Sequence, residues 1–299
     1  MLSSKRTPLS ILTRGLMLIS SLFLFINCDK SNSLSAEDDL YTDEQAAEAI
    51  ASGMAAESGG AVDQMSDLSS LAGVEGIQNM ADAARSLAKK NGDRVTAIDT
   101  SYDENNGKWT IAVSIERAIP QRNFTARFYR VYSVQYLQGG QFQKYYITNG
   151  DTANTIKFDI VEGTGNVQSL RLKHRLKSLS ASWVATNANQ RLMAVAGSYT
   201  RSAADTFSTR KTVSTMDQSL TLNFAGISIP ADDSEEVPAL IAGVMSGDFV
   251  ADITITKGEE SSQKSVDRSF SVAFSSKVIK VVINGGEYTA DTTTGELDG

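Results

Sequence analysis

Cysteine and histidine are almost absent from this sequence, which has one of each among 299 residues, Cys28 and His174. A single thiol forms no internal disulfide, and a single histidine excludes metal sites built from several histidines. The sequence also lacks a G-x-S-x-G motif and a phosphate-binding loop, so neither pattern indicates catalysis. We therefore predict a non-enzymatic protein that has no cofactor and no metal site and is stabilised by packing alone.

Long apolar runs are missing as well. The most apolar stretch, residues 15–26, is 12 residues long, whereas a membrane-spanning helix needs roughly 20 apolar residues. It follows a positive head formed by Lys5, Arg6 and Arg14, and it ends at Cys28, after which the chain is polar. A basic head followed by a short apolar segment is typical of a secretory signal peptide.

This leader resembles the signal peptides of bacterial lipoproteins, which are cut just before a cysteine whose thiol carries a diacylglycerol. Phe25, Ile26 and Asn27 depart from the usual Leu, small residue, and Gly or Ala, and look like the relaxed boxes of spirochaetes. The resemblance implies a signal peptide at 1–27, then a lipidated Cys28 and a polar tether at 28–40. It also implies an envelope location, with the outer membrane favoured and the protein facing the periplasm or the cell surface. The alternative is a core cysteine behind an uncleaved anchor.

Charge is unevenly distributed along the chain. There are 28 Lys and Arg against 35 Asp and Glu, and the leader holds three of the cations, so the mature chain has a net charge of −10. This acidity argues against nucleic-acid binding. Residues 121–177 are the exception, with nine cations against three carboxylates.

The sharpest pattern in that basic stretch is LRLKHRLK, residues 170–177. On a strand, its four cations would lie on one face, ~6.6–6.8 Å apart, and His174 would lie on the opposite face with the leucines. The cations would suit an anionic lipid or a sulfated glycan. The plainer alternative is a solvated face whose charges guard the strand against edge pairing. The candidate anion-binding residues are Arg171, Lys173, Arg175 and Lys177.

Residues 41–92 read as a helical segment. Thr42 and Gln45 form a capping-box signature that opens a helix running to Gly59 and Gly60. A weaker helix is expected in 62–72, and a clearer one in 76–91, where apolar residues follow one stripe up to a Lys-Lys-Asn-Gly stop.

Beyond residue 92 the hydrophobic period changes from 3.6 to 2, which indicates strands over 93–299. Turn signals recur, among them Asn-Asn-Gly at 105–107, Gly-Thr-Gly-Asn at 163–166 and Asn-Gly-Gly at 284–286. About a dozen short strands in an antiparallel meander are expected, with the helices covering a face. The predicted fold class is α+β, mainly β, with sandwich, half-barrel and closed barrel left open. A short helix is also expected at 239–245.

Three further segments have both a functional and a plain interpretation. DENNG at 103–107 and ADDSEEV at 231–237 offer oxygen ligands for calcium, or are simply a hairpin turn and an acidic loop. RFYRVYSVQY at 127–136 mixes arginines with aromatic residues, as in binding surfaces and in central strands. We predict a lipid-anchored envelope lipoprotein with a binding or structural role. The alternative is a carrier of an apolar or lipid ligand in a curved sheet covered by helices.

Overall fold

The computed structural model describes residues 42–56, 58–73, 76–77, 93–119, 123–232 and 237–298. The predicted signal peptide, Cys28 and the polar tether lie outside these residues. So does almost all of the helix predicted in 76–91.

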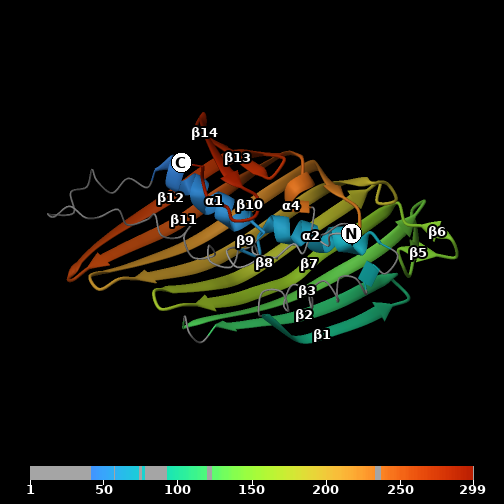
Figure 1. Cartoon of the computed structure of the whole chain (residues 1–299), viewed down its shortest axis with the longest axis horizontal. Coiled ribbons are helices and arrows are strands. Elements are labelled where there is room, and N and C mark those ends of the chain that lie inside the picture. Colours follow the sequence, from blue (N-terminus) through green and yellow to red (C-terminus); the bar gives the residue numbers. More distant parts are fainter. Residues whose placement is uncertain are drawn as a thin grey trace, which may run out of the picture.

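One large antiparallel sheet dominates the structure (Figure 1), as the alternating pattern predicted. Within the described residues it has 12 strands, and a separate hairpin is formed by β5 and β6. The helices are α1 (Asp43–Met54), α2 (Ala61–Leu71) and α4 (Val237–Leu240). The strands are β1 (Asp93–Asp103), β2 (Lys108–Ile119), β3 (Phe124–Gln138), β4 (Gln141–Gln143), β5 (Ile147–Thr148), β6 (Asp151–Thr152), β7 (Thr155–Gln168), β8 (Leu172–Thr186), β9 (Leu192–Ser208), β10 (Thr212–Pro230), β11 (Gly243–Lys257), β12 (Glu260–Ser275), β13 (Val278–Ile283) and β14 (Gly286–Asp291).

The sheet is a meander, and the prediction of that topology is confirmed. The strand order is β1-β2-β3-β7-β8-β9-β10-β11-β12-β13-β14, with β4 paired only to β3. Among the described residues, β1 and β14 are the two ends of this order, so the sheet is open rather than a closed barrel. The strands are longer than expected, and β10 reaches 19 residues. A single sheet also differs from the two packed sheets of a sandwich.

The two faces of the sheet differ in polarity. On β11, Met245, Phe249, Ala251 and Ile253 are buried, while Asp248 and Asp252 between them are exposed. We call the face that carries the buried side chains, against which the helices pack, the inner face, and the other the outer face. On the outer face, the hydroxyl groups of Ser265 and Ser269, both on the neighbouring strand β12, donate to these carboxylates. Strict alternation thus places the apolar core on one side of the sheet only.

The inner face carries a ladder of aromatic rings across neighbouring strands. Ring centroids are 5.3 Å apart between Tyr132 and Phe158, 5.7 Å between Phe158 and Trp183, and 6.4 Å between Trp183 and Tyr199. Phe224 meets Trp183 edge-on at 5.1 Å. Cross-strand aromatic pairs of this kind stabilise a sheet beyond the area that they bury.

Helix α1 begins where the capping box predicted. The Thr42 hydroxyl accepts from the Gln45 backbone N–H at 3.2 Å, and the Thr42 N–H donates to the Gln45 side chain at 3.0 Å. The helix ends at Met54, before the predicted stop. The double glycine instead turns the chain into α2, because a Cβ on Gly60 would lie within 3 Å of the carbonyl group of Met54.

Two local predictions are wrong. The Gly-Thr-Gly-Asn segment at 163–166 is not a turn but part of β7. Its glycines make room for neighbours, since a Cβ on Gly163 would lie 2.6 Å from the Leu179 Cβ, and one on Gly165 would lie 2.5 Å from the Phe128 ring. The helix expected at 239–245 covers only the end of α4, because β11 already begins at Gly243.

Candidate functional site

Three arginines lie in one line across the inner face, beneath the helices. We call Arg130, Arg201 and Arg268 the arginine row. Residues paired across neighbouring strands trace this line from β3 to β12 as Arg130, Gly163, Leu179, Arg201, Leu220, Phe249 and Arg268. Gly163 and Leu179 are not a backbone pair. They are placed side by side because the Leu179 side chain fills the space that a Cβ on Gly163 would occupy. Each arginine reaches up from the sheet to a different point on α1 or α2.

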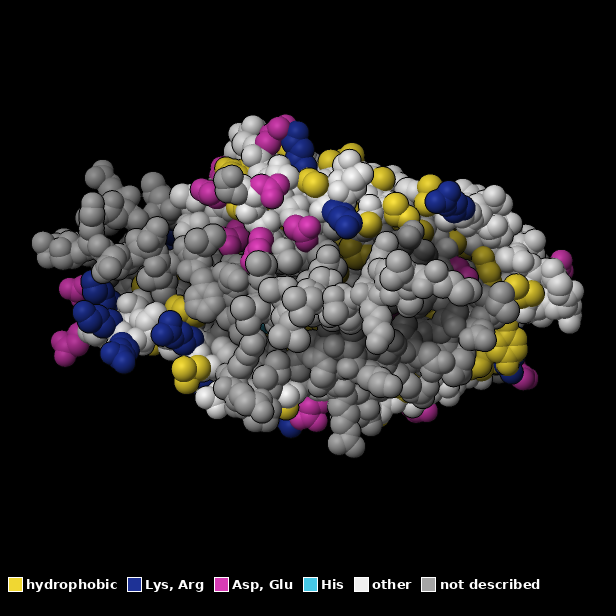
Figure 2. All heavy atoms as spheres, viewed as in Figure 1, with side chains coloured by type: hydrophobic (Ala, Val, Ile, Leu, Met, Phe, Trp, Pro, Cys, Tyr) yellow, Lys and Arg dark blue, Asp and Glu magenta, His cyan; other side chains and the backbone are white. Residues whose placement is uncertain are grey.

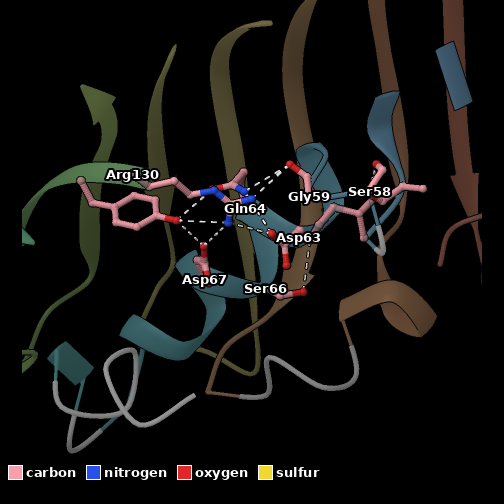
Figure 3. Close-up of polar contacts among 10 residues, drawn as sticks. Ser58, Gly59, Asp63, Gln64, Ser66, Asp67 and Arg130 are labelled. Carbon is pink, nitrogen blue, oxygen red and sulfur yellow. Dashed lines mark hydrogen bonds and ion pairs between the residues drawn. The ribbon is translucent and has the colours of Figure 1, made fainter. Parts of the chain in front are cut away.

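Arg130 of β3 holds the start of α2 (Figure 3). Its Nη1 donates to Asp63 Oδ2 at 2.8 Å and lies 3.7 Å from Asp67 Oδ2, and its Nη2 donates to the Gly59 carbonyl at 3.4 Å. The Arg130 side chain is only 9 % exposed. A buried arginine needs such partners, because a charge left unpaired in the interior is strongly destabilising.

Asp67 is the second carboxylate of this cluster. The Tyr132 hydroxyl donates to Asp67 Oδ2 at 2.7 Å. Burial, followed by the nearby Asp63 carboxylate, raises the pKa of Asp67 to about 7, although Arg130 and the Tyr132 hydrogen bond act in the opposite direction. The single positive charge of Arg130 is therefore shared between two carboxylates, Asp63 and Asp67, which also repel each other.

Arg201 of β9 holds the end of α1. Its Nη1 donates to the Gly53 carbonyl at 3.0 Å, in the last turn, where helix carbonyls lack partners within the helix. Its Nη2 lies 3.3 Å from His174 Nε2. A guanidinium group can only donate, so Nε2 accepts and the His174 proton sits on Nδ1. That nitrogen donates to Asp205 Oδ1 at 2.5 Å, and Gln218 donates to the other carboxylate oxygen at 2.7 Å.

Arg268 of β12 holds the beginning of α1. Its Nε donates to Asp43 Oδ1 at 2.6 Å, and the Asn284 side chain donates to Asp43 Oδ2 at 3.0 Å. These hydrogen bonds, first that from Arg268 and then that from Asn284, hold the pKa of Asp43 below its usual value. A carboxylate in the first turn is also favoured by the positive end of the helix dipole. The arginine row thus fastens both ends of α1 and the start of α2.

The arginine row was not predicted from the sequence. Arg130 was noticed within RFYRVYSVQY, but neither Arg201 nor Arg268 was singled out. The sequence did contain an indication of it, because each of the three arginines occupies a position where the alternating pattern of its strand places inward-facing residues. His174 was expected on the leucine face, and it does share the inner face with Leu176.

The structure places all four residues of the predicted anion site at the surface, and it divides them. Arg171 precedes β8, while Lys173, Arg175 and Lys177 lie within the strand, and all four are exposed. A register shift between Leu176 and Ser178 interrupts the pairing at Lys177, whose Nζ lies 2.6 Å from Asp217 of β10. Anion binding by these residues stays a prediction.

The calcium candidates take plain roles where they are described. Asp103 accepts hydrogen bonds from the Asn105 backbone and from the Asn106 side chain, so DENNG forms a hairpin turn. Most of ADDSEEV lies outside the described residues. In the described part of the chain, no three or more His, Cys, Asp or Glu residues gather as a metal site would require. None of the helices described is long and apolar enough to cross a membrane.

Glu48 of α1 is an ionisable group with a predictable effect on stability. Its side chain is buried against the core, with the residue 5 % exposed. Burial, and to a lesser degree the carboxylates of Glu44 and Glu296, raises the pKa of Glu48 to about 7. The folded state therefore retains a proton that the unfolded chain loses from about pH 4.5 upward. This contribution to stability is greatest below that pH and is lost as the pH rises to 7.

We expect Glu48→Gln to raise the free energy of unfolding at pH 8 by about 1–2 kcal/mol and to change it much less at pH 5. Urea unfolding at the two pH values measures this difference. Glu104→Gln, in the exposed turn between β1 and β2, is the matched control and should have little effect at either pH. Equal effects of the Glu48 variant at pH 5 and pH 8 would contradict the shifted pKa.

Comparison with known proteins returns no relative: no protein family, no curated protein and no solved structure matches this chain.

Proposed function

We propose that this protein is a non-enzymatic, lipid-anchored lipoprotein of the bacterial cell envelope, and that it carries an apolar ligand, such as the acyl chains of a lipid, on the inner face of its sheet. The leader supports the anchor at Cys28. The way in which helices cover the inner face supports the carrier.

The observation that carries this proposal is a difference in polarity: the inner face is apolar, whereas the contacts that hold the helices over it are polar. The face itself is lined by aromatic and aliphatic side chains such as Phe158, Trp183 and Phe249. The helices that cover it are tied down by ion pairs and hydrogen bonds from the arginine row. Polar contacts of this kind can exchange with water, whereas an entirely apolar contact cannot. Moving α1 and α2 would expose an apolar surface suited to acyl chains.

Native mass spectrometry of the full chain carrying Cys28→Ser tests the carrier function, since this variant has no acyl group of its own on residue 28. We expect non-covalent adducts with the masses of phospholipids, and saturable binding of the fluorescent fatty acid cis-parinaric acid. A protein that emerges without lipid and leaves the probe unbound would instead favour a binding module with a filled core.

A disulfide can test whether the helices have to move. A Cβ on Gly53 would lie 3.1 Å from Leu220 Cδ2, so Gly53→Cys with Leu220→Cys brings two thiols close together. In the Cys28→Ser background these are the only cysteines. Oxidation should block uptake of cis-parinaric acid, and reduction of the same sample should restore it. Uptake at the same rate in both states would contradict access through movement of α1.

The anchor has its own test. Replacing Cys28 with Ser should release the protein from the membrane fraction and abolish its labelling by radioactive palmitate, because two acyl chains give stable membrane attachment. Detergent phase partitioning compares the variant with the parent. Unchanged partitioning of the variant would contradict lipidation and favour an uncleaved hydrophobic anchor.

A further inference from the structure

Three hairpin turns lie together at one end of the sheet. They join β7 to β8, β9 to β10, and β11 to β12. The antiparallel register places them side by side, since Leu172 pairs with Phe207 and Thr212 pairs with Lys257. In Figure 1 this end of the sheet is on the left.

This end of the sheet is strongly basic. Its exposed cations, which we call the basic end, are Arg171, Lys173, Arg210, Lys211 and Lys257. Glu259 and Glu260 are the carboxylates of the same three turns and strand ends. In the described part of the chain, none of the five cations forms an ion pair. Figure 2 shows Lys and Arg side chains gathered at the left of the molecule, with a few carboxylates beside them.

The opposite end of the sheet has a different balance. Counted with the strand ends, as at the basic end, the described residues there include four carboxylates and four cations, namely Asp103, Glu104, Asp151, Asp232, Lys108, Lys144, Arg191 and Lys277. The charge is therefore polarised along the strands, within a chain whose net charge is negative. An anionic surface that approaches the protein is attracted at the basic end and repelled over most of the remainder.

We infer that the basic end docks onto the surface of an anionic lipid membrane. Its cations are spread over three adjacent hairpin tips, so they can meet a plane together, whereas a single small anion could touch only one or two of them. Each Lys or Arg close to an anionic bilayer adds to the attraction, and the attraction falls off within a Debye length. Turns are also the parts of a sheet that can approach a surface without disturbing strand pairing.

The proposed anchor agrees with this orientation, and this step alone rests on the proposed function. Fourteen residues, 28–41, separate Cys28 from the start of the described chain. They can span at most ~46–50 Å. The beginning of α1 is fixed to Arg268, which lies eight residues along β12 from Glu260 at the basic end. Eight residues of strand measure ~27 Å. A lipid on Cys28 can therefore lie in the plane that the basic end would touch.

The experiment compares two triple variants in the full chain carrying Cys28→Ser, so that acylation does not contribute. The test variant is Arg210→Ser, Lys211→Ser, Lys257→Ser. The control variant is Lys157→Ser, Arg191→Ser, Lys277→Asn, which changes the net charge equally at exposed positions elsewhere. Co-sedimentation with vesicles of phosphatidylglycerol and phosphatidylcholine, and with vesicles of phosphatidylcholine alone, is measured at low and at physiological salt.

We expect the parent and the control to bind anionic vesicles similarly, and the test variant to bind at least about tenfold more weakly at low salt. The difference should shrink at physiological salt and vanish on neutral vesicles. Equal loss in both variants would mean that only net charge matters, and this would overturn the proposal. Retention on heparin without binding to anionic vesicles would overturn it in favour of a sulfated glycan. Neither outcome bears on lipid carriage, which native mass spectrometry measures separately.

Discussion

Replacing Arg130 with methionine is expected to lower the free energy of unfolding by about 3–5 kcal/mol at pH 7. The side chain is nearly fully buried, and its loss leaves Asp63 and Asp67 facing each other without a cation between them. Methionine keeps much of the aliphatic volume, so the effect reports on the charge rather than on a cavity. Urea unfolding followed by circular dichroism measures it.

The matched control is Arg127→Met on the same strand. Arg127 also pairs with a carboxylate, Glu116, at 2.8 Å, but on the outer face, where its side chain is 74 % exposed. Exposed ion pairs contribute about 0–1 kcal/mol. Equal losses of stability in the two variants would mean that the ion pairs of Arg130 do not hold α2 on the sheet. This would contradict the proposal that polar contacts attach the helices to the inner face.

Replacing Trp183 with alanine is expected to lower the free energy of unfolding by about 3–5 kcal/mol. Trp183 is 1 % exposed and lies at the centre of the aromatic ladder, where it contacts Phe158, Tyr199 and Phe224. Its removal leaves a cavity beneath the helices that the neighbouring strands cannot close, because their register is fixed by pairing on both sides. Thermal and urea unfolding both measure the loss.

Two further variants separate volume from polarity at this position. Within the described residues, Trp183 Nε1 is buried without a hydrogen-bond partner. Trp183→Phe removes that unpaired N–H but keeps a ring, so it should cost much less than the alanine change. Val184→Ala, on the outer face of the same strand, should shift stability by no more than about 0.5 kcal/mol. A similar loss in the alanine and phenylalanine variants would mean that the indole has a polar partner.

Local features of the sheet followed from short stretches of sequence. The period of two placed buried and exposed residues correctly on β2, β11 and β12, and Asn105 to Gly107 formed the expected hairpin turn. Such features depend on neighbours a few residues apart, because side chains alternate along a strand and Asn-Gly accepts the backbone geometry of a tight turn. The start of α1 was predictable for the same reason, since Thr42 and Gln45 satisfy each other's backbone groups.

Glycines in β7 show where local signals mislead. Gly163 and Gly165 resemble a turn, but they stay in the strand because Leu179 and Phe128 from neighbouring strands fill the space above them. No pattern within β7 records the side chains that lie across from it. Tertiary contact therefore overrode local preference, as it often does for glycine within a strand.

By itself, the sequence determined the class of fold, the meander and the beginning of the first helix, because these depend on period, turn chemistry and capping within short windows. The tertiary structure alone decided the arginine row and the basic end. Arg130, Arg201 and Arg268 are far apart in the chain. They align only because the lengths of the strands between them in the sheet, β7, β8, β10 and β11, and of their turns set the register that joins them. Arg171, Arg210 and Lys257 likewise meet only because successive hairpins of an antiparallel sheet return to the same end.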